Sequence, residues 1–123
     1  MADVDPELLG LLDDLDGFAW LPGMDLILAG VRQMAEAADG ELGLDETQTL
    51  LAVIAQPGGT DLTELFALLA RTLTSPARNR ALDQLDPDTA KTVQRLGEVH
   101  AHETAVFAVR EHTNEAAGLI APS

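Results

Sequence analysis

The chain has 123 residues, of which 46% are hydrophobic and 3% aromatic, and its formal net charge is −14. Seven basic residues stand against 21 acidic ones, so most of the surface should repel nucleic acid and anionic membranes. There is no cysteine, which excludes disulfides, thiol catalysis and cysteine-ligated zinc. The length predicts one domain, residues 1–123. No stretch resembles a signal peptide or is apolar enough to span a bilayer, so we expect a cytoplasmic protein or part of an intracellularly assembled particle.

The spacing of apolar residues predicts an all-α fold, a compact bundle of five to six helices, and no alternating strand pattern is present. Five helices are expected before residue 86: a first from Asp5-Pro6-Glu7 to Asp16-Gly17, a second from about Met24 to Ala38, a third from Asp45 to Ala55, a fourth from Thr60 or Asp61 through Leu73, and a short fifth over Ala77–Leu85 that begins at Ser75-Pro76. The second, third and fourth should form the core. The only tryptophan, Trp20, is expected to cover the end of the bundle.

The clearest apolar stripe belongs to the fourth helix and consists of Leu62, Leu65, Phe66, Leu69 and Leu73. A longer helix, about 86–118, is predicted to follow. Asp86 is a good N-cap, Pro87 suits the first helical position, and Gly118 is a plausible stop. Such a helix would be roughly 50 Å long, whereas a compact chain of this length is about 35 Å across. We therefore expect it to project from its own domain and to act as an oligomerisation arm.

Two strips on this long helix suit helix contacts. A heptad seam is formed by Thr89, Val93, Leu96, His100, Glu103, Phe107, Arg110 and Asn114. His100 and Glu103 lie one turn apart, and we interpret them as a polar layer that fixes the register of a helix pair. A second strip has small side chains, Gly97, Ala101, Thr104 and Ala108, which would let another helix approach closely. The predicted interface comprises Val93, Leu96, Gly97, His100, Ala101, Glu103, Phe107, Ala108 and Arg110.

Charge is unevenly distributed along the chain. Residues 1–70 carry 14 acids and one base, a net of −13, whereas residues 71–95 carry five bases and three acids, a net of +2. Residues 44–85, which overlap this basic segment, are loosely similar to the core of winged-helix regulators of the multiple-antibiotic-resistance type. The resemblance follows the order Leu44, Gln48, Leu51, Ile54, Gly58-Gly59, Glu64-Leu65, Ser75-Pro76, Leu82 and Leu85. It implies a DNA-reading helix that carries Arg78, Asn79 and Arg80.

This sequence departs from that family in two places. The segment from Glu64 to Ser75 is about one turn too long, and Asp86-Pro87 begins a helix where the family has its β-hairpin wing. A helix-turn-helix shape used only for packing explains the pattern as well. DNA binding is therefore an alternative interpretation, and nucleic acid is not an expected partner.

A metal site is a further alternative. Di-iron bundles place Glu-x-x-His on each of two helices. Here the order is reversed, His100-x-x-Glu103, and occurs once, with His102 nearby and no histidine outside this helix. A buried polar layer explains the same residues, so we expect no metal and no other cofactor.

No catalytic constellation is evident: serine occurs only at Ser75 and Ser123, and Gly58-Gly59 lacks the lysine of a phosphate loop. The sequence thus favours a non-catalytic, acidic interaction or assembly protein that associates with itself as a dimer or larger oligomer. An adaptor, a structural subunit of a larger particle and an inhibitor all fit. The acidity is compatible with a high-salt habitat, a GC-rich genome or a basic partner.

Overall fold

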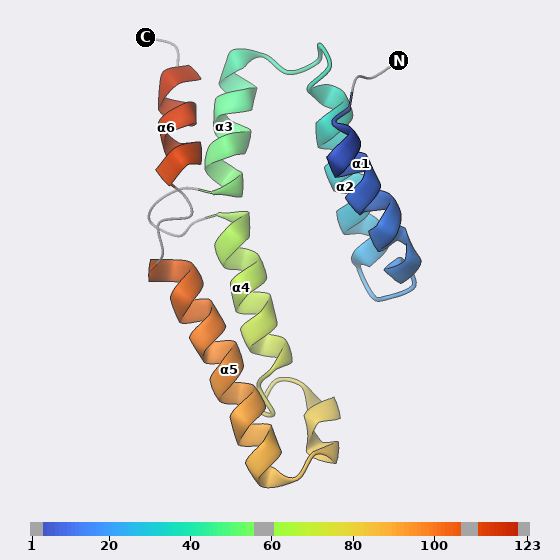
Figure 1. Ribbon diagram of the computed structural model, residues 1–123, viewed down its shortest axis with the longest axis vertical. Coiled ribbons are helices and arrows are strands. Elements are labelled where there is room, and N and C mark those ends of the chain that lie inside the picture. The colour runs from blue at the N-terminus through green and yellow to red at the C-terminus, as the bar shows by residue number, and fades with distance from the viewer. Residues whose placement is uncertain (1–3, 56–60, 107–110, 121–123) are drawn as a thin grey trace. The chain divides into compact units, whose positions relative to one another are not determined.

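The computed structural model describes residues 4–55, 61–106 and 111–120 of the chain. These residues form six α-helices and two short 3₁₀ helices and contain no strand (Figure 1). The predicted all-α fold class with five to six helices is confirmed. The elements are α1 Pro6–Leu15, η1 Asp16–Phe18, α2 Met24–Ala37, α3 Leu44–Ile54, α4 Leu62–Leu73, η2 Arg80–Gln84, α5 Pro87–Val106 and α6 Glu111–Ile120. No helix in the described ranges has the length and apolar character needed to cross a membrane.

The chain divides into two compact units, residues 1–47 and residues 48–123. The first unit contains α1, η1 and α2. The second contains most of α3 together with α4, η2, α5 and α6. The single domain expected from the length of the chain stays a prediction.

In the first unit, α1 and α2 form a helical hairpin. Asp5 caps α1 as the sequence predicts, because its carboxylate accepts a hydrogen bond of 2.9 Å from the backbone N–H of Glu7. Leu12 of α1 and Leu28 of α2 are buried, each with only 3% of its surface exposed. Trp20, in contrast, is 77% exposed, so the expectation that it covers the end of the bundle is wrong.

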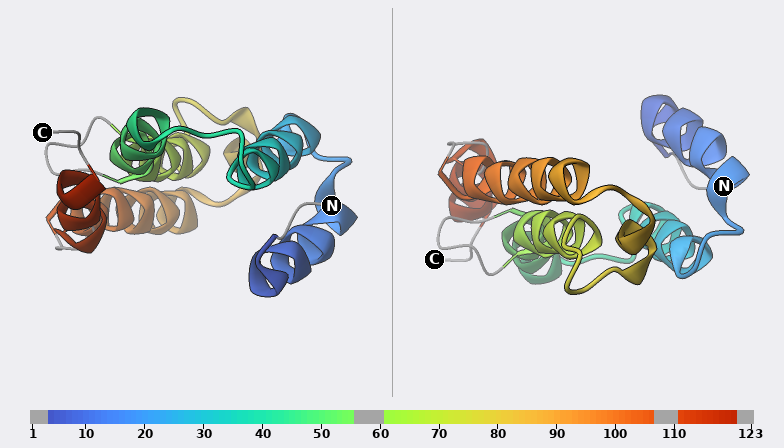
Figure 2. Two further views of the ribbon diagram at one scale, coloured as in Figure 1. Left: turned by 90° about the horizontal axis from the view of Figure 1, so that it is seen from above. Right: turned by 90° about the horizontal axis from the view of Figure 1, so that it is seen from below.

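In the second unit, α4 and α5 form an antiparallel pair and lie side by side in all three views (Figures 1 and 2). Both helices begin with an aspartate cap. Asp61 accepts a hydrogen bond of 2.7 Å from the N–H of Glu64, and Asp86 accepts one of 3.2 Å from the N–H of Thr89. A hydrogen bond joins α6 to the end of α3: the Thr113 hydroxyl donates to the carbonyl oxygen of Ala55 over 3.0 Å.

The fifth helix expected over Ala77–Leu85 does not form as an α-helix. A turn over residues 76–78 leads instead into the 3₁₀ helix η2. The predicted cap, Ser75, accepts with its backbone carbonyl from the N–H groups of Arg78 and Asn79, and Asn79 is the residue that caps η2. Side-chain bonds from Asn79 to Ala81 N and Leu73 O satisfy the backbone locally, and such bonds compete with α-helix formation.

The long helix predicted over 86–118 corresponds to α5 and α6. Helix α5 continues through Gly97 without interruption, and α6 reaches Ile120. Continuity between the two helices depends on residues 107–110, which lie outside the described residues.

Candidate functional site

Among the described residues of α4 and α5, those that are fully buried have small side chains. Ala67 of α4 is 2% exposed and Ala101 of α5 is 5% exposed. Gly97 is buried as well, and a Cβ atom at this position would overlap the side chain of Thr74 at the end of α4. The two backbones therefore approach closely along a strip with little side-chain volume between them.

Larger apolar side chains of the same two helices remain in contact with solvent. The exposed fraction is 45% for Phe66, 45% for Leu69 and 54% for Leu73 on α4, and it is 58% for Leu96 on α5. The clearest apolar stripe in the sequence is therefore only partly used as core. The expectation that α4 contributes its stripe to the core needs this correction: α4 fully buries Ala67, keeps Leu62 and Leu68 half-buried, and leaves Leu65, Phe66, Leu69 and Leu73 exposed.

These exposed residues lie on one side of the α4–α5 pair. Phe66, Leu73 and Leu96 each directly precede an inward-facing residue, namely Ala67, Thr74 and Gly97. An α-helix turns by about 100° per residue, and antiparallel neighbours turn in opposite senses when viewed end-on. A residue that precedes an inward-facing one consequently points to the same side on both helices. We call Phe66, Leu69, Leu73 and Leu96, with Leu65 and Val99 at the edges, the outer apolar face.

The predicted interface residues fall into three groups. Leu96, His100 and Glu103 are exposed on α5, and Val93 is half-buried. Gly97 and Ala101 are buried against α4 of the same chain, so the close helix approach expected for the small-residue strip occurs within one chain. Phe107, Ala108 and Arg110 lie outside the described residues.

The histidines of the metal-site alternative do not converge. His100 and His102 are both exposed, and two residues of separation leave their side chains about 160° apart around the helix axis. Among the residues the structure describes, no group of three His, Cys, Asp or Glu side chains could hold a metal ion.

The arginines of the DNA-binding alternative lie on a turn and on η2. Arg78 and Arg80 are exposed, whereas Asn79 uses its side-chain amide to donate to Leu73 O at 2.9 Å and its oxygen to accept from Ala81 N at 3.2 Å. Both polar groups of Asn79 are thus bound to backbone, and a 3₁₀ helix of five residues is too short to lie along a major groove.

Two charged side chains, Asp86 and Arg32, have pKa values shifted from their ordinary ones. The Thr89 hydroxyl donates to Asp86 at 2.6 Å, and this bond, with the Thr89 N–H, lowers the pKa of Asp86. In the first unit, Arg32 donates to Asp16 at 2.6 Å, which raises the pKa of the guanidinium. Asp86 caps α5, Arg32 links α2 to Asp16 at the end of α1, and neither lies on the outer apolar face.

Comparison with known protein families, with curated proteins and with solved structures finds no match to this chain. Function is therefore argued from the geometry of the second unit. What the sequence patterns did not indicate was the exposure of the α4 stripe, because a helical stripe shows which face is apolar and not what covers it.

Proposed function

We propose that this protein is a non-catalytic assembly protein that associates with itself through the outer apolar face of the α4–α5 pair. The observation that carries the proposal is that α4 and α5 bury small residues against each other and leave larger apolar residues exposed. Small residues close the pair, and Phe66, Leu73 and Leu96 are left 45%, 54% and 58% exposed on one side. Contiguous exposed apolar surface of this kind marks interaction sites in water-soluble proteins.

A second copy of the chain is the occupant that the charges favour. Two copies with a net charge of −14 each repel one another over most of their surfaces. Repulsion between acidic surfaces is weakest around residues 71–95, which carry a net charge of +2; this segment includes Leu73 and ends next to Leu96. Pairing through the Leu73 and Leu96 end of the outer apolar face therefore brings together the least acidic parts of two chains.

The polar seam residues give such a pair a register. Glu103 lies at the same angular position as Leu96, two turns further along α5, and His100 lies between them. In a two-fold pair of antiparallel helices, His100 of one chain can face Glu103 of the partner subunit. The remaining acidic surface would stay in water and could contact a basic partner, as in an adaptor, a particle subunit or an inhibitor. The proposal includes the cytoplasmic location expected from the sequence.

Light scattering of the full-length chain over a range of concentrations tests this proposal. We expect a dimer or larger oligomer for the wild type and a monomer for the double variant Leu73→Asp/Leu96→Asp. Leu26→Asp on α2 is the matched control, because Leu26 is 74% exposed and lies outside the second unit. It should leave the oligomer unchanged.

A wild-type monomer at about 100 µM, a concentration far above that needed by a stable dimer, would contradict the proposal. If the double variant also lowered the melting temperature of that monomer, the outer apolar face would be covered within the chain instead.

A further inference from the structure

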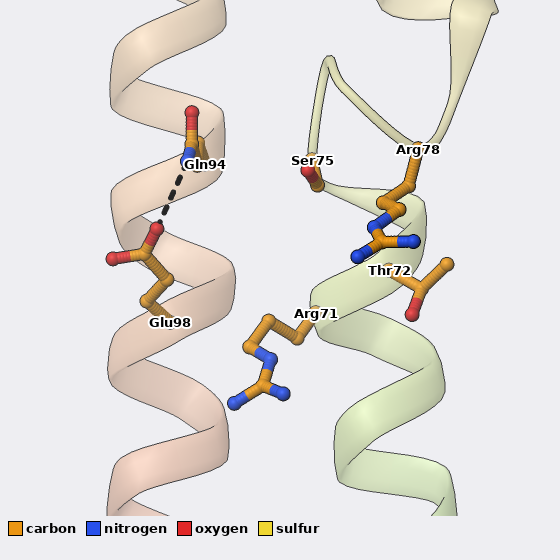
Figure 3. Close-up of a pocket in the computed structure, with 6 residues that line it drawn as sticks. All are labelled: Arg71, Thr72, Ser75, Arg78, Gln94 and Glu98. Carbon is orange, nitrogen blue, oxygen red and sulfur yellow. Dashed lines mark hydrogen bonds between the residues drawn. The ribbon is translucent and has the colours of Figure 1, made fainter.

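The opposite side of the α4–α5 pair carries a polar hollow. It has a volume of about 240 Å³ and lies between the end of α4, the following turn and the middle of α5 (Figure 3). Its lining consists of Arg71, Thr72, Ser75, Arg78, Gln94 and Glu98. Ser75 and Glu98 directly follow the inward-facing Thr74 and Gly97, which places them across the pair from the outer apolar face.

The two arginines of the hollow have no ion-pair partner among the residues that the structure describes, where the ion pairs present join Arg32 to Asp13 and Asp16. This is unexpected in a chain with three acids for every base. Figure 3 shows Arg71 reaching from α4 towards α5, with the guanidinium of Arg78 turned back over Thr72. Two like charges that line one hollow repel each other, and an anion between them would remove that repulsion.

The other groups of the hollow are suited to hydrogen bonding. The Ser75 side chain is half-buried, and no hydrogen bond occupies its hydroxyl within the described ranges. Gln94 donates to Glu98 over 3.1 Å, which holds the carboxylate against its own helix, beyond ion-pair distance of Arg71 (Figure 3). Guanidinium groups bind carboxylate and phosphate oxygens through paired N–H donors, and a hydroxyl adds a further donor.

We propose that the hollow lined by Arg71, Ser75 and Arg78 is a binding site for an oxyanion, a carboxylate or phosphate group on a small ligand. The volume is below the roughly 300 Å³ at which pockets for drug-sized molecules begin, so the site accepts one such group with a short organic remainder. Glu98 at the edge opposes a highly charged anion and would favour a ligand that also carries a hydrogen-bond donor.

Titration of the full-length protein with inorganic phosphate and, separately, with succinate, followed by the amide NMR signals of residues 71–98, tests the assignment. We expect saturable shifts centred on Ser75 and Arg78 for at least one of the two probes, and the probe that binds more tightly identifies the oxyanion. Arg71→Gln and Arg78→Gln should each weaken binding by about tenfold or more, as expected for loss of a charge-assisted hydrogen bond. Glu98→Gln should strengthen it.

Arg95→Gln is the matched control, because Arg95 is exposed on α5 and does not line the hollow. Equal weakening by Arg95→Gln and Arg78→Gln would show an adventitious ion only and would overturn the proposal, as would the absence of saturable shifts with both probes. Circular dichroism of each variant confirms that it is folded. Leu73→Asp/Leu96→Asp should keep oxyanion binding, so the oxyanion site and the proposed self-association are tested independently of each other.

Discussion

The side chain of Thr74 occupies the space that a Cβ atom on Gly97 would need. Thr74 ends α4, where its hydroxyl lies 2.9 Å from the carbonyl oxygen of Ala70 and 3.0 Å from that of Arg71. The hydroxyl therefore bonds to the last turn of α4, and the same side chain, with its hydroxyl oxygen nearest, fills the space beside Gly97 of α5. Glycine at position 97 is what allows the two helices to meet at this point.

Gly97→Ala should consequently destabilise the second unit. Alanine gains up to about 1 kcal/mol in helix propensity over glycine, but forcing a methyl group into an occupied space costs typically 1–3 kcal/mol. We expect a net loss of about 1–2 kcal/mol in the free energy of unfolding, measured by urea denaturation with circular dichroism.

Gly118→Ala provides the matched control for this substitution, because a Cβ at Gly118 meets nothing within 4 Å. This change should leave stability equal or slightly higher. Adding Thr74→Gly to Gly97→Ala should recover part of the loss, since it removes the overlapping atoms. A Gly97→Ala variant as stable as Gly118→Ala would show that the two helices do not approach closely at Thr74.

Helix starts were predictable from the sequence because cap chemistry is local. An aspartate oxygen reaches a backbone N–H two or three residues ahead, and this is what Asp5, Asp61 and Asp86 do. The short helix after Ser75 was predicted wrongly for a related reason. Asn79 can bond to the backbone on both sides of itself, and neither bond leaves a periodic signal in the sequence.

The element that packs against a helix face could not be predicted from the sequence, because residue spacing shows which face is apolar but not what covers it. Gly97 and Ala101 were recognised as a strip that permits close approach, yet the helix that approaches them is α4 of the same chain. The stripe through Phe66 and Leu73 was recognised as apolar, yet it stays exposed once α4 has paired through Ala67. Which of two apolar faces becomes buried depends on the volume of the contacting residues on both helices.

Asp86 should make the second unit sensitive to acid. Its pKa is lower in the folded chain than its ordinary value of 3.8, because Thr89 donates to the carboxylate. The stabilising contribution of Asp86 is thus complete above its ordinary pKa and is lost as the pH falls through the lower, folded-state pKa. Thermal melts from neutral pH to strongly acidic pH should show this loss in the wild type.

Asp86→Asn separates charge from capping in the same measurement, since asparagine can still accept the Thr89 N–H bond. The variant should lose the pH-dependent part of the contribution and retain most of the stability at low pH. Asp88→Asn is the control, because Asp88 is an acid in the first turn of α5 that does not serve as its N-cap. This variant should keep the acid sensitivity of the wild type. Identical pH profiles for Asp86→Asn and the wild type would refute the role assigned to the carboxylate.

Arg32 is the only basic residue among residues 1–70 and joins α2 to Asp16 at the end of α1 over 2.6 Å. Arg32→Gln should lower the melting temperature of the first unit at low ionic strength, because it removes this ion pair and leaves 14 acids in that region without a base. The difference from the wild type should shrink as salt is added, since screening weakens both effects. Arg95→Gln, which removes an equal charge where no ion pair is present among the described residues, should show a smaller effect.

Thr113 offers a direct test of how α6 is held. Its hydroxyl donates to the carbonyl oxygen of Ala55, 58 positions earlier in the chain, over 3.0 Å, and Ala55 itself is only 6% exposed. Thr113→Val preserves the shape of the side chain but leaves that buried carbonyl without this donor, so we expect a loss of about 1 kcal/mol in the free energy of unfolding. Thr92→Val is the control, because the Thr92 hydroxyl bonds to Asp88 within its own helix. Faster amide hydrogen exchange in α6 for Thr113→Val alone would show that this bond fixes the helix, whereas equal exchange in the two variants would mean that α6 is held by other contacts.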